Sequence, residues 1–117
     1  MKNSDLTSTF KRKPLFFKEK APLVKILVED ILWIEAIGGL ISVHTENGRF
    51  TVRDTFKEIG SMLPNGKFIR VHRSFIIPLD KITQVNEKSV VINKVLIPVG
   101  EAYRPALKNM SQLTQSS

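Results

Sequence analysis

Apolar and polar residues alternate along most of the chain with the spacing of β-strands. Val24, Ile26 and Val28 recur at every second position, and Glu29-Asp30 marks a turn into the apolar run that follows. Further strands are predicted near 68–77, 82–85, 89–92 and 95–99, with turns at 78–81, 86–88 and 93–94. Many short strands with frequent turns predict an all-β fold, built from antiparallel sheets with one or two short helices.

The clearest local pattern is a β-hairpin around Asn47-Gly48. This dipeptide favours a two-residue type I′ turn between alternating strands, and that turn would pair Val43 with Val52. In this register, residues 41, 43, 50 and 52 share the buried face of the hairpin, while His44 points the other way.

A short helix is predicted next, beginning at Thr55. Thr55 and Glu58 have the spacing of a capping box, in which each side chain satisfies a backbone amide of the other residue. Apolar residues recur at 56, 59 and 62 or 63, and Pro-Asn-Gly at 64–66 ends the helix. A second helix is expected over 104–110, with Pro105 in its first turn, where a missing amide donor is tolerated.

Composition excludes several classes of chemistry. The 117 residues suffice for one compact domain, and a hydrophobic content of 42% supports a core. No cysteine is present, which excludes disulfides, thiolate chemistry and zinc sites built on cysteine. His44 and His72 have no second ligand at metal-binding spacing, so we expect neither a metal ion nor another cofactor. No phosphate-binding glycine loop or nucleophile elbow occurs, and we expect no enzyme.

The apolar runs are far shorter than the ~18 residues that a membrane span needs. The first residues are polar and do not form a secretory signal. We therefore expect a cytoplasmic protein.

The net charge of +7 is unevenly distributed. The first 20 residues carry six cations and two anions, a net charge of +4, against 12 cations and nine anions in the rest. Residues 1–13 lack periodicity, and we expect a disordered basic arm or linker remnant there, a folded domain over 14–110 and a disordered tail over 111–117. Such an arm binds nucleic acid without reading its sequence.

The most distinctive segment runs from Phe68 to Ile82. It places Arg70, His72 and Arg73 within four residues and then continues into an apolar run. A strand of this kind suits a rigid scaffold that presents a basic edge. The plainer interpretation is a surface strand whose charges only keep the protein soluble.

Two further segments flank this one, DILWIEAIGG over 30–39 and LIPVGEAYRPAL over 96–107. In this order and spacing, the three segments resemble the LytTR family of DNA-binding domains. Members of that family carry strings such as D-I-x-[YW]-I-E, then F-x-R-x-H-R-S-[FY]-I-V-N-x-[DR]-x-I, then I-P-V-S-R-x-Y, and the similarity covers residues 23–108. The resemblance implies an elongated arrangement of small sheets whose loops line one edge, and an effector domain of LytR/AlgR-type response regulators.

The resemblance also implies that Arg73 contacts DNA, because the residue directly after the histidine of this block faces DNA in the family. The planar fork of an arginine binds guanine or a phosphate through two hydrogen bonds. Arg70 is a second candidate, and a salt bridge on the strand surface is its alternative. His72 is a third, which contacts a phosphate or packs against the neighbouring strand.

The loop around Gly38-Gly39 departs from the family pattern. Relatives often place a polar or histidine side chain there, whereas this chain offers backbone amides and apolar neighbours. Contact would then rest on those amides or on a thymine methyl group. Pro78 is a further departure, at a position where the family often has Asn.

The third candidate segment departs as well. Gly100-Glu101 replaces the usual Ser-Arg pair, and phosphate would repel Glu101 unless that carboxylate accepted a hydrogen bond from cytosine. Arg104 or Lys108 would supply the missing cation from one turn further on. These departures predict altered, weaker or less specific DNA recognition.

Three functions follow from these patterns. The first is sequence-specific binding of duplex DNA by a bacterial transcription regulator, with loops in successive major grooves and two copies on repeated half-sites. Its further partners would be an upstream receiver domain and a sensor kinase. The second is a β-rich interaction module that binds DNA only non-specifically through the basic arm. RNA binding is the third and the weakest, because only Tyr103 and a few phenylalanines could stack on bases.

Overall fold

The computed structural model describes residues 14–17 and 24–115, with side chains over 25–110. Within these residues the chain forms three antiparallel sheets and two α-helices, which confirms the predicted fold class. The expected basic arm at 1–13 lies outside the described residues.

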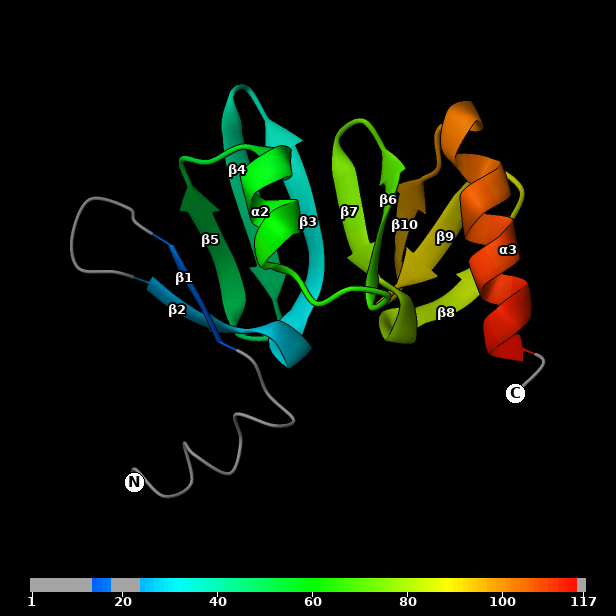
Figure 1. Ribbon diagram of the computed structural model, residues 1–117, viewed down its shortest axis with the longest axis horizontal. Coiled ribbons are helices and arrows are strands. Elements are labelled where there is room, and N and C mark those ends of the chain that lie inside the picture. The colour runs from blue at the N-terminus through cyan, green and yellow to red at the C-terminus, as the bar shows by residue number, and fades with distance from the viewer. Residues whose placement is uncertain (1–13, 18–23, 116–117) are drawn as a thin grey trace, which may run out of the picture.

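The largest sheet has five strands (Figure 1). In spatial order they are β5 (Gly48–Val52), β4 (Leu40–Thr45), β3 (Ile31–Ile37), β7 (Phe75–Pro78) and β6 (Phe68–His72). Helix α2 (Phe56–Met62) lies across one face of this sheet. It begins as predicted, because Thr55 Oγ1 accepts a hydrogen bond from the backbone N of Glu58 at 3.1 Å.

A three-stranded sheet and helix α3 form the other side of the molecule (Figure 1). This sheet contains β10 (Val95–Pro98), β9 (Ser89–Ile92) and β8 (Ile82–Val85), in that order. Helix α3 (Arg104–Gln115) continues five residues beyond the predicted end at Met110, so residues 111–115 belong to the helix. The short 3₁₀ helices η1 (Val28–Asp30) and η2 (Leu79–Lys81) lead into β3 and β8.

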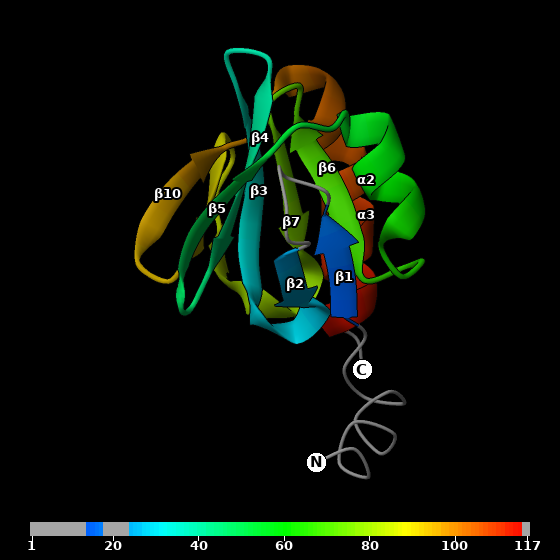
Figure 2. The same ribbon diagram turned by 90° about the vertical axis from the view of Figure 1, so that its left-hand side faces the viewer.

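A third, two-stranded sheet pairs β1 (Pro14–Phe17) with β2 (Val24–Leu27). Figure 2 shows this pair with the left side of the molecule turned toward the viewer.

The core consists of two apolar clusters on opposite faces of the five-stranded sheet. The first lies under α2 and includes Ile34 and Ile59, both fully buried. The second joins the sheet to the three-stranded sheet and to Leu107 of α3. Strand β7 contributes to both clusters, since Ile76 and Ile77 point to opposite faces of the sheet. Burying each such side chain stabilises the fold by about 1.5–3 kcal/mol, so the sheet is anchored on both faces.

The prediction of one strand over 68–77 is wrong. The chain reverses at Arg73-Ser74 and forms the β6–β7 hairpin, in which Ile69 pairs with Ile77. From Phe68 to Arg70, each even-numbered residue pairs with an even-numbered one and each odd-numbered residue with an odd-numbered one. Odd and even residues therefore keep the same faces on both strands, as they would in one continuous strand. The reversal moves Arg73 from the middle of a strand to the tip of a turn.

The predicted register of the β4–β5 hairpin is also wrong. Its loop is Glu46-Asn47, and Val43 pairs with Phe50 in place of Val52. Thr45 Oγ1 accepts a hydrogen bond from the backbone N of Asn47 at 3.1 Å and donates one to the Gly48 carbonyl at 2.9 Å, which closes the loop one residue early. The pairing partner of Val43 shifts by two positions, an even number, so residues 41, 43, 50 and 52 still share one face as predicted.

Candidate nucleic-acid interface

Three connections lie along one edge of the molecule, at the top of Figure 1. They are the β3–β4 turn, the β6–β7 turn and the segment from Gly100 through η3 (Glu101–Tyr103) into α3. Backbone hydrogen bonds tie them together. Ala36 N donates to the Ser74 carbonyl at 2.9 Å, and Gly100 N donates to the Val71 carbonyl at 2.7 Å. The sheet therefore fixes the spacing of the three segments, which we call the loop edge.

The β6–β7 turn is held by the side chain of Arg70. Its Nη2 donates to the Arg73 carbonyl at 2.7 Å and its Nε donates to the His72 carbonyl at 3.3 Å. The guanidinium also lies 4.9 Å from the centre of the Phe56 ring. The expected alternative for Arg70, a salt bridge, does not occur among the residues with described side chains. Arg73 itself is exposed at the tip of the turn.

His72 has a packing role in this turn. Its Nδ1 accepts a hydrogen bond from Ser74 N at 3.0 Å, and its ring meets the Phe75 ring edge-on with centroids 5.7 Å apart. This hydrogen bond leaves Nε2 as the ring atom available for an outside partner.

The β3–β4 turn has an apolar tip. Gly38 and Gly39 have φ angles of +53° and +83°, the pair of positive values that a type I′ turn requires. Ile37 and Leu40 pair across the turn, and they remain 48% and 38% exposed. A tip of this kind presents backbone amides and methyl groups to whatever it touches.

Gly100 brings the third segment against the β6–β7 hairpin. A Cβ atom at this position would lie 3.1 Å from Tyr103 Cδ2 and 3.8 Å from His72 Cα. The close approach therefore depends on the missing side chain.

The charged residues of the third segment differ in exposure. Glu101 and Lys108 are exposed, whereas Arg104 is partly buried. Arg104 Nε is itself buried and makes no hydrogen bond to the described residues. Of the two cations proposed from the sequence, Lys108 is therefore the freer to reach an outside group.

The profile of the LytTr DNA-binding domain family matches residues 21–112. The chain belongs to this family. It is 30% identical over 119 residues to the sensory transduction protein LytT of Bacillus anthracis, and the alignment covers 97% of this chain and 48% of that relative. The LytT protein of Bacillus subtilis (strain 168) is 33% identical over 94 residues, which cover 75% of this chain and 39% of the relative. The chain thus spans about half or less of the length of these curated relatives.

A solved structure of a LytTr DNA-binding domain from Bacillus cereus has the same fold. It superimposes with a TM-score of 0.72 at 20% sequence identity, covering 84% of this chain and 95% of that one. The resemblance seen in the sequence is therefore confirmed. Family membership assigns DNA binding to the chain, in a family of DNA-binding domains rather than enzymes.

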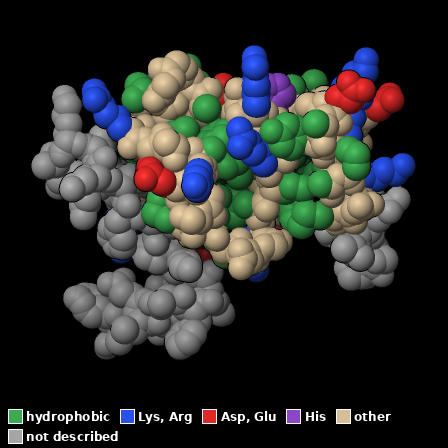
Figure 3. Space-filling model, turned by 45° about the horizontal axis from the view of Figure 1, so that its top comes forward, with side chains coloured by type: hydrophobic (Ala, Val, Ile, Leu, Met, Phe, Trp, Pro, Cys, Tyr) green, Lys and Arg blue, Asp and Glu red, His purple; other side chains and the backbone are tan. Residues whose placement is uncertain are grey.

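The surface of this LytTr domain near the loop edge mixes basic and apolar side chains. Figure 3 shows the top of the molecule brought forward, with several Lys or Arg side chains and a histidine set among hydrophobic ones. Acidic side chains gather mainly toward one end of this surface. Such a surface can neutralise phosphates and still approach bases closely.

His44 is the described group whose pKa burial changes most clearly. Its ring stacks on Trp33 with centroids 4.5 Å apart, and its Nε2 lies 3.3 Å from Glu35 Oε1. Burial lowers the pKa of His44; Glu35 opposes this shift and Arg49 adds to it. Burial therefore disfavours the charged form of His44.

Among the residues that the structure describes, no three potential ligands gather at a metal site. No helix in this part of the chain is long and apolar enough to cross a membrane.

Two features of the interface have no signal in the sequence. The bonds from Ala36 to Ser74 and from Gly100 to Val71 join segments that are distant along the chain. The inward role of Arg70 depends on the reversal at Arg73-Ser74, which the alternation of side chains conceals.

Proposed function

We propose that this LytTr domain binds duplex DNA sequence-specifically, with the loop edge across the duplex and its turns in successive major grooves. The observation that carries the proposal is the β6–β7 turn, where Arg73 stands exposed on a backbone that Arg70 holds by two hydrogen bonds. A cation on a fixed backbone loses little freedom when its fork binds a guanine through O6 and N7.

The other members of the loop edge then have distinct tasks. The apolar tip at Gly38-Gly39 suits contact with a thymine methyl group, and Lys108 suits a phosphate. Glu101 is exposed and would be tolerated only opposite a donor such as cytosine N4. The duplex that binds best would therefore present guanine, thymine and cytosine at positions set by the spacing of the three segments.

We further propose that the domain acts as the effector of a bacterial transcription regulator. The LytT relatives are named as sensory transduction proteins and are more than twice as long as the stretch they share with this chain. A receiver domain and a sensor kinase would supply the signal. Two copies of the domain would bind half-sites repeated at about one helical turn, ~10–10.5 base pairs apart.

A second candidate is a module that keeps the fold and binds DNA only through its basic arm. Gly38-Gly39 and Glu101 favour this alternative, because both replace side chains that relatives use for contact. Deleting residues 1–13 separates the two functions. Loss of all DNA binding would favour the arm, whereas retained sequence preference would favour the loop edge.

The experiment that tests the proposal is selection of bound duplexes from a random DNA pool, using the full chain and residues 14–117. We expect both proteins to enrich the same motif, and binding to fall steeply with salt as phosphate contacts release counterions. Arg73→Ala should reduce affinity by about 1–3 kcal/mol and relax the preference at one base pair. A folded protein that enriches no motif would contradict sequence-specific binding.

A further inference from the structure

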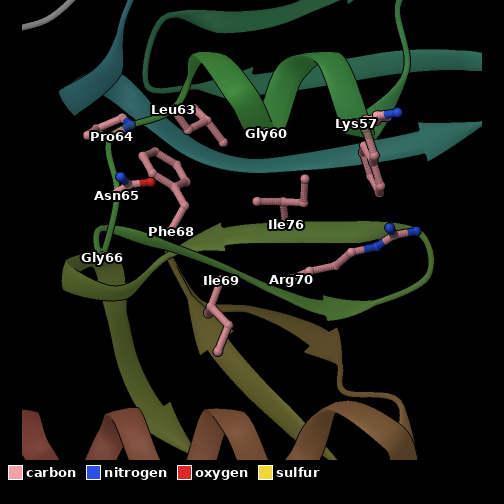
Figure 4. Close-up of a pocket in the computed structure, with 11 residues that line it drawn as sticks. Lys57, Gly60, Leu63, Pro64, Asn65, Gly66, Phe68, Ile69, Arg70 and Ile76 are labelled. Carbon is pink, nitrogen blue, oxygen red and sulfur yellow. The ribbon is translucent and has the colours of Figure 1, made fainter.

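A groove lies between α2 and the β6–β7 hairpin (Figure 4). Its volume is about 290 Å³, close to the lower bound of ~300 Å³ for pockets that hold a small organic ligand. Apolar side chains from three elements line it: Phe56, Leu63, Phe68 and Ile76. These side chains also pack in the core cluster under α2, so the groove is part of the folded structure.

Two cations line the same end of this groove, one on each wall. Figure 4 shows Lys57 of α2 and Arg70 of β6 at the end opposite Leu63 and Pro64. Neither Lys57 nor Arg70 forms an ion pair with a carboxylate among the residues with described side chains. An anion placed there would meet two positive charges, neither of which is engaged in an ion pair with the described side chains.

The guanidinium of Arg70 is already fixed in position. It uses two of its five N–H groups for the His72 and Arg73 carbonyls and rests on the Phe56 ring. Three of its N–H groups remain to bind a further acceptor.

We infer that this groove is a binding site for a small amphipathic carboxylate. Its ring or short alkyl chain lies between Leu63, Phe68 and Ile76, and its carboxylate lies at Lys57 and Arg70. The charge and the lining together select this class of ligand, because a bare phosphate would leave the apolar floor uncovered. A DNA phosphate is the competing occupant of the two cations, and it is one outcome of the test below.

Binding at this site would act on the loop edge through Arg70. The same guanidinium holds the β6–β7 turn, so a carboxylate that draws on Arg70 changes the setting of Arg73. By linkage, the ligand and a specific duplex then weaken each other by the same factor. This consequence rests on the proposed DNA binding, whereas ligand binding itself does not.

Gly60 allows the groove to be blocked without touching either cation. It lines the groove, and a Cβ atom built on it would meet nothing within 4 Å. Gly60→Leu therefore adds a bulky side chain at the wall of the groove without a clash at its Cβ. Gly60→Ala is the matched control that makes the same backbone change without the bulk. Neither substitution removes a group assigned to DNA contact.

The test is a titration of the isotope-labelled full chain, followed by amide NMR shifts, with 4-phenylbutyrate, its neutral amide and inorganic phosphate. We expect saturable shifts at 56–60 and 68–70 with the carboxylate at millimolar concentrations. The amide should bind about tenfold more weakly, and so should the carboxylate to Gly60→Leu, a loss of ~1.4 kcal/mol in each case. Gly60→Ala should bind like the unaltered protein, and Gly60→Leu should keep the dispersion of a folded spectrum.

Three results would overturn the inference. They are no saturable shift with phenylbutyrate, equal shifts with phosphate alone, which would identify a site for a DNA phosphate only, and unaltered binding by a folded Gly60→Leu variant. The titration contains no DNA, so its outcome is independent of whether a preferred duplex exists. A selected duplex that binds equally well with and without bound phenylbutyrate would refute the coupling through Arg70. It would leave the ligand site itself unaffected.

Discussion

Replacing Arg70 by methionine removes the guanidinium and keeps a long apolar stem beside Phe56. The change deletes two hydrogen bonds to turn carbonyls, one of 2.7 Å and a weaker one of 3.3 Å, and a contact 4.9 Å from an aromatic ring. Both carbonyls belong to an exposed turn where water can replace the donor, so each bond counts at the low end of about 0.5–1.5 kcal/mol. An exposed cation–π contact adds ~0.5–1 kcal/mol. We expect Arg70→Met to lower the free energy of unfolding by about 1–2 kcal/mol.

Urea unfolding measures this loss of stability, and DNA binding tests whether Arg70 holds the β6–β7 turn. Arg70→Lys keeps the charge and loses the planar fork, so it separates a phosphate contact from a role in holding the turn. If Arg70 holds the turn, Arg70→Lys recovers little of the loss, and both variants bind a selected duplex with reduced discrimination. Full rescue by lysine, or an unchanged urea midpoint in Arg70→Met, would refute the reasoning.

Three further predictions concern stability. Gly39→Ala should destabilise the protein by about 1–3 kcal/mol, because the φ of +83° at this position strains an L-residue; urea unfolding measures it, with Gly60→Ala as the helical control. Thr55→Ala should cost about 0.5–2 kcal/mol through the lost cap, and Thr55→Ser should restore most of it in the same assay. Burial lowers the pKa of His44 below 6.5, so the unfolded chain takes up this proton first, and stability falls as pH drops below 6.5. His44→Gln should flatten that fall when unfolding is compared at about pH 5.5 and pH 7.5, and an equal fall in both proteins would assign it to other groups.

The elements with strong local chemistry were predictable from the sequence. Thr55 and Glu58 have the spacing of a capping box, and Thr55 Oγ1 caps the helix as predicted. The short strands 82–85 and 89–92 also have the predicted bounds, since turn residues delimit them on both sides. Family membership followed from three segments whose order and spacing are preserved.

The two wrong predictions concern turns that were placed from the alternation of apolar and polar residues or from a turn dipeptide. A hairpin that pairs odd with odd positions preserves the pattern of a single strand, which concealed the turn at Arg73-Ser74. Asn47-Gly48 favours a turn at that dipeptide, but the hydroxyl of Thr45 closes the loop one residue earlier. Such side-chain hydrogen bonds depend on three-dimensional placement, which periodicity does not encode.

The arrangement of the candidate site was not predictable from the sequence. Arg70 was expected to reach outward, whereas its guanidinium turns back to the Arg73 carbonyl. Lys57 was not predicted as a site residue, because only the fold places it at the same end of a groove as Arg70. Whether Arg73 reads a base stays a prediction.

The most direct test is an NMR map of the labelled chain with the duplex obtained by selection and with a scrambled duplex of equal length at the same salt concentration. Our proposal predicts that amides at Gly38-Gly39, Arg73-Ser74 and 100–103 shift together with the selected duplex and much less with the scrambled one. Equal shifts with both duplexes, confined to residues 1–13, would contradict it and leave the basic arm as the source of DNA binding.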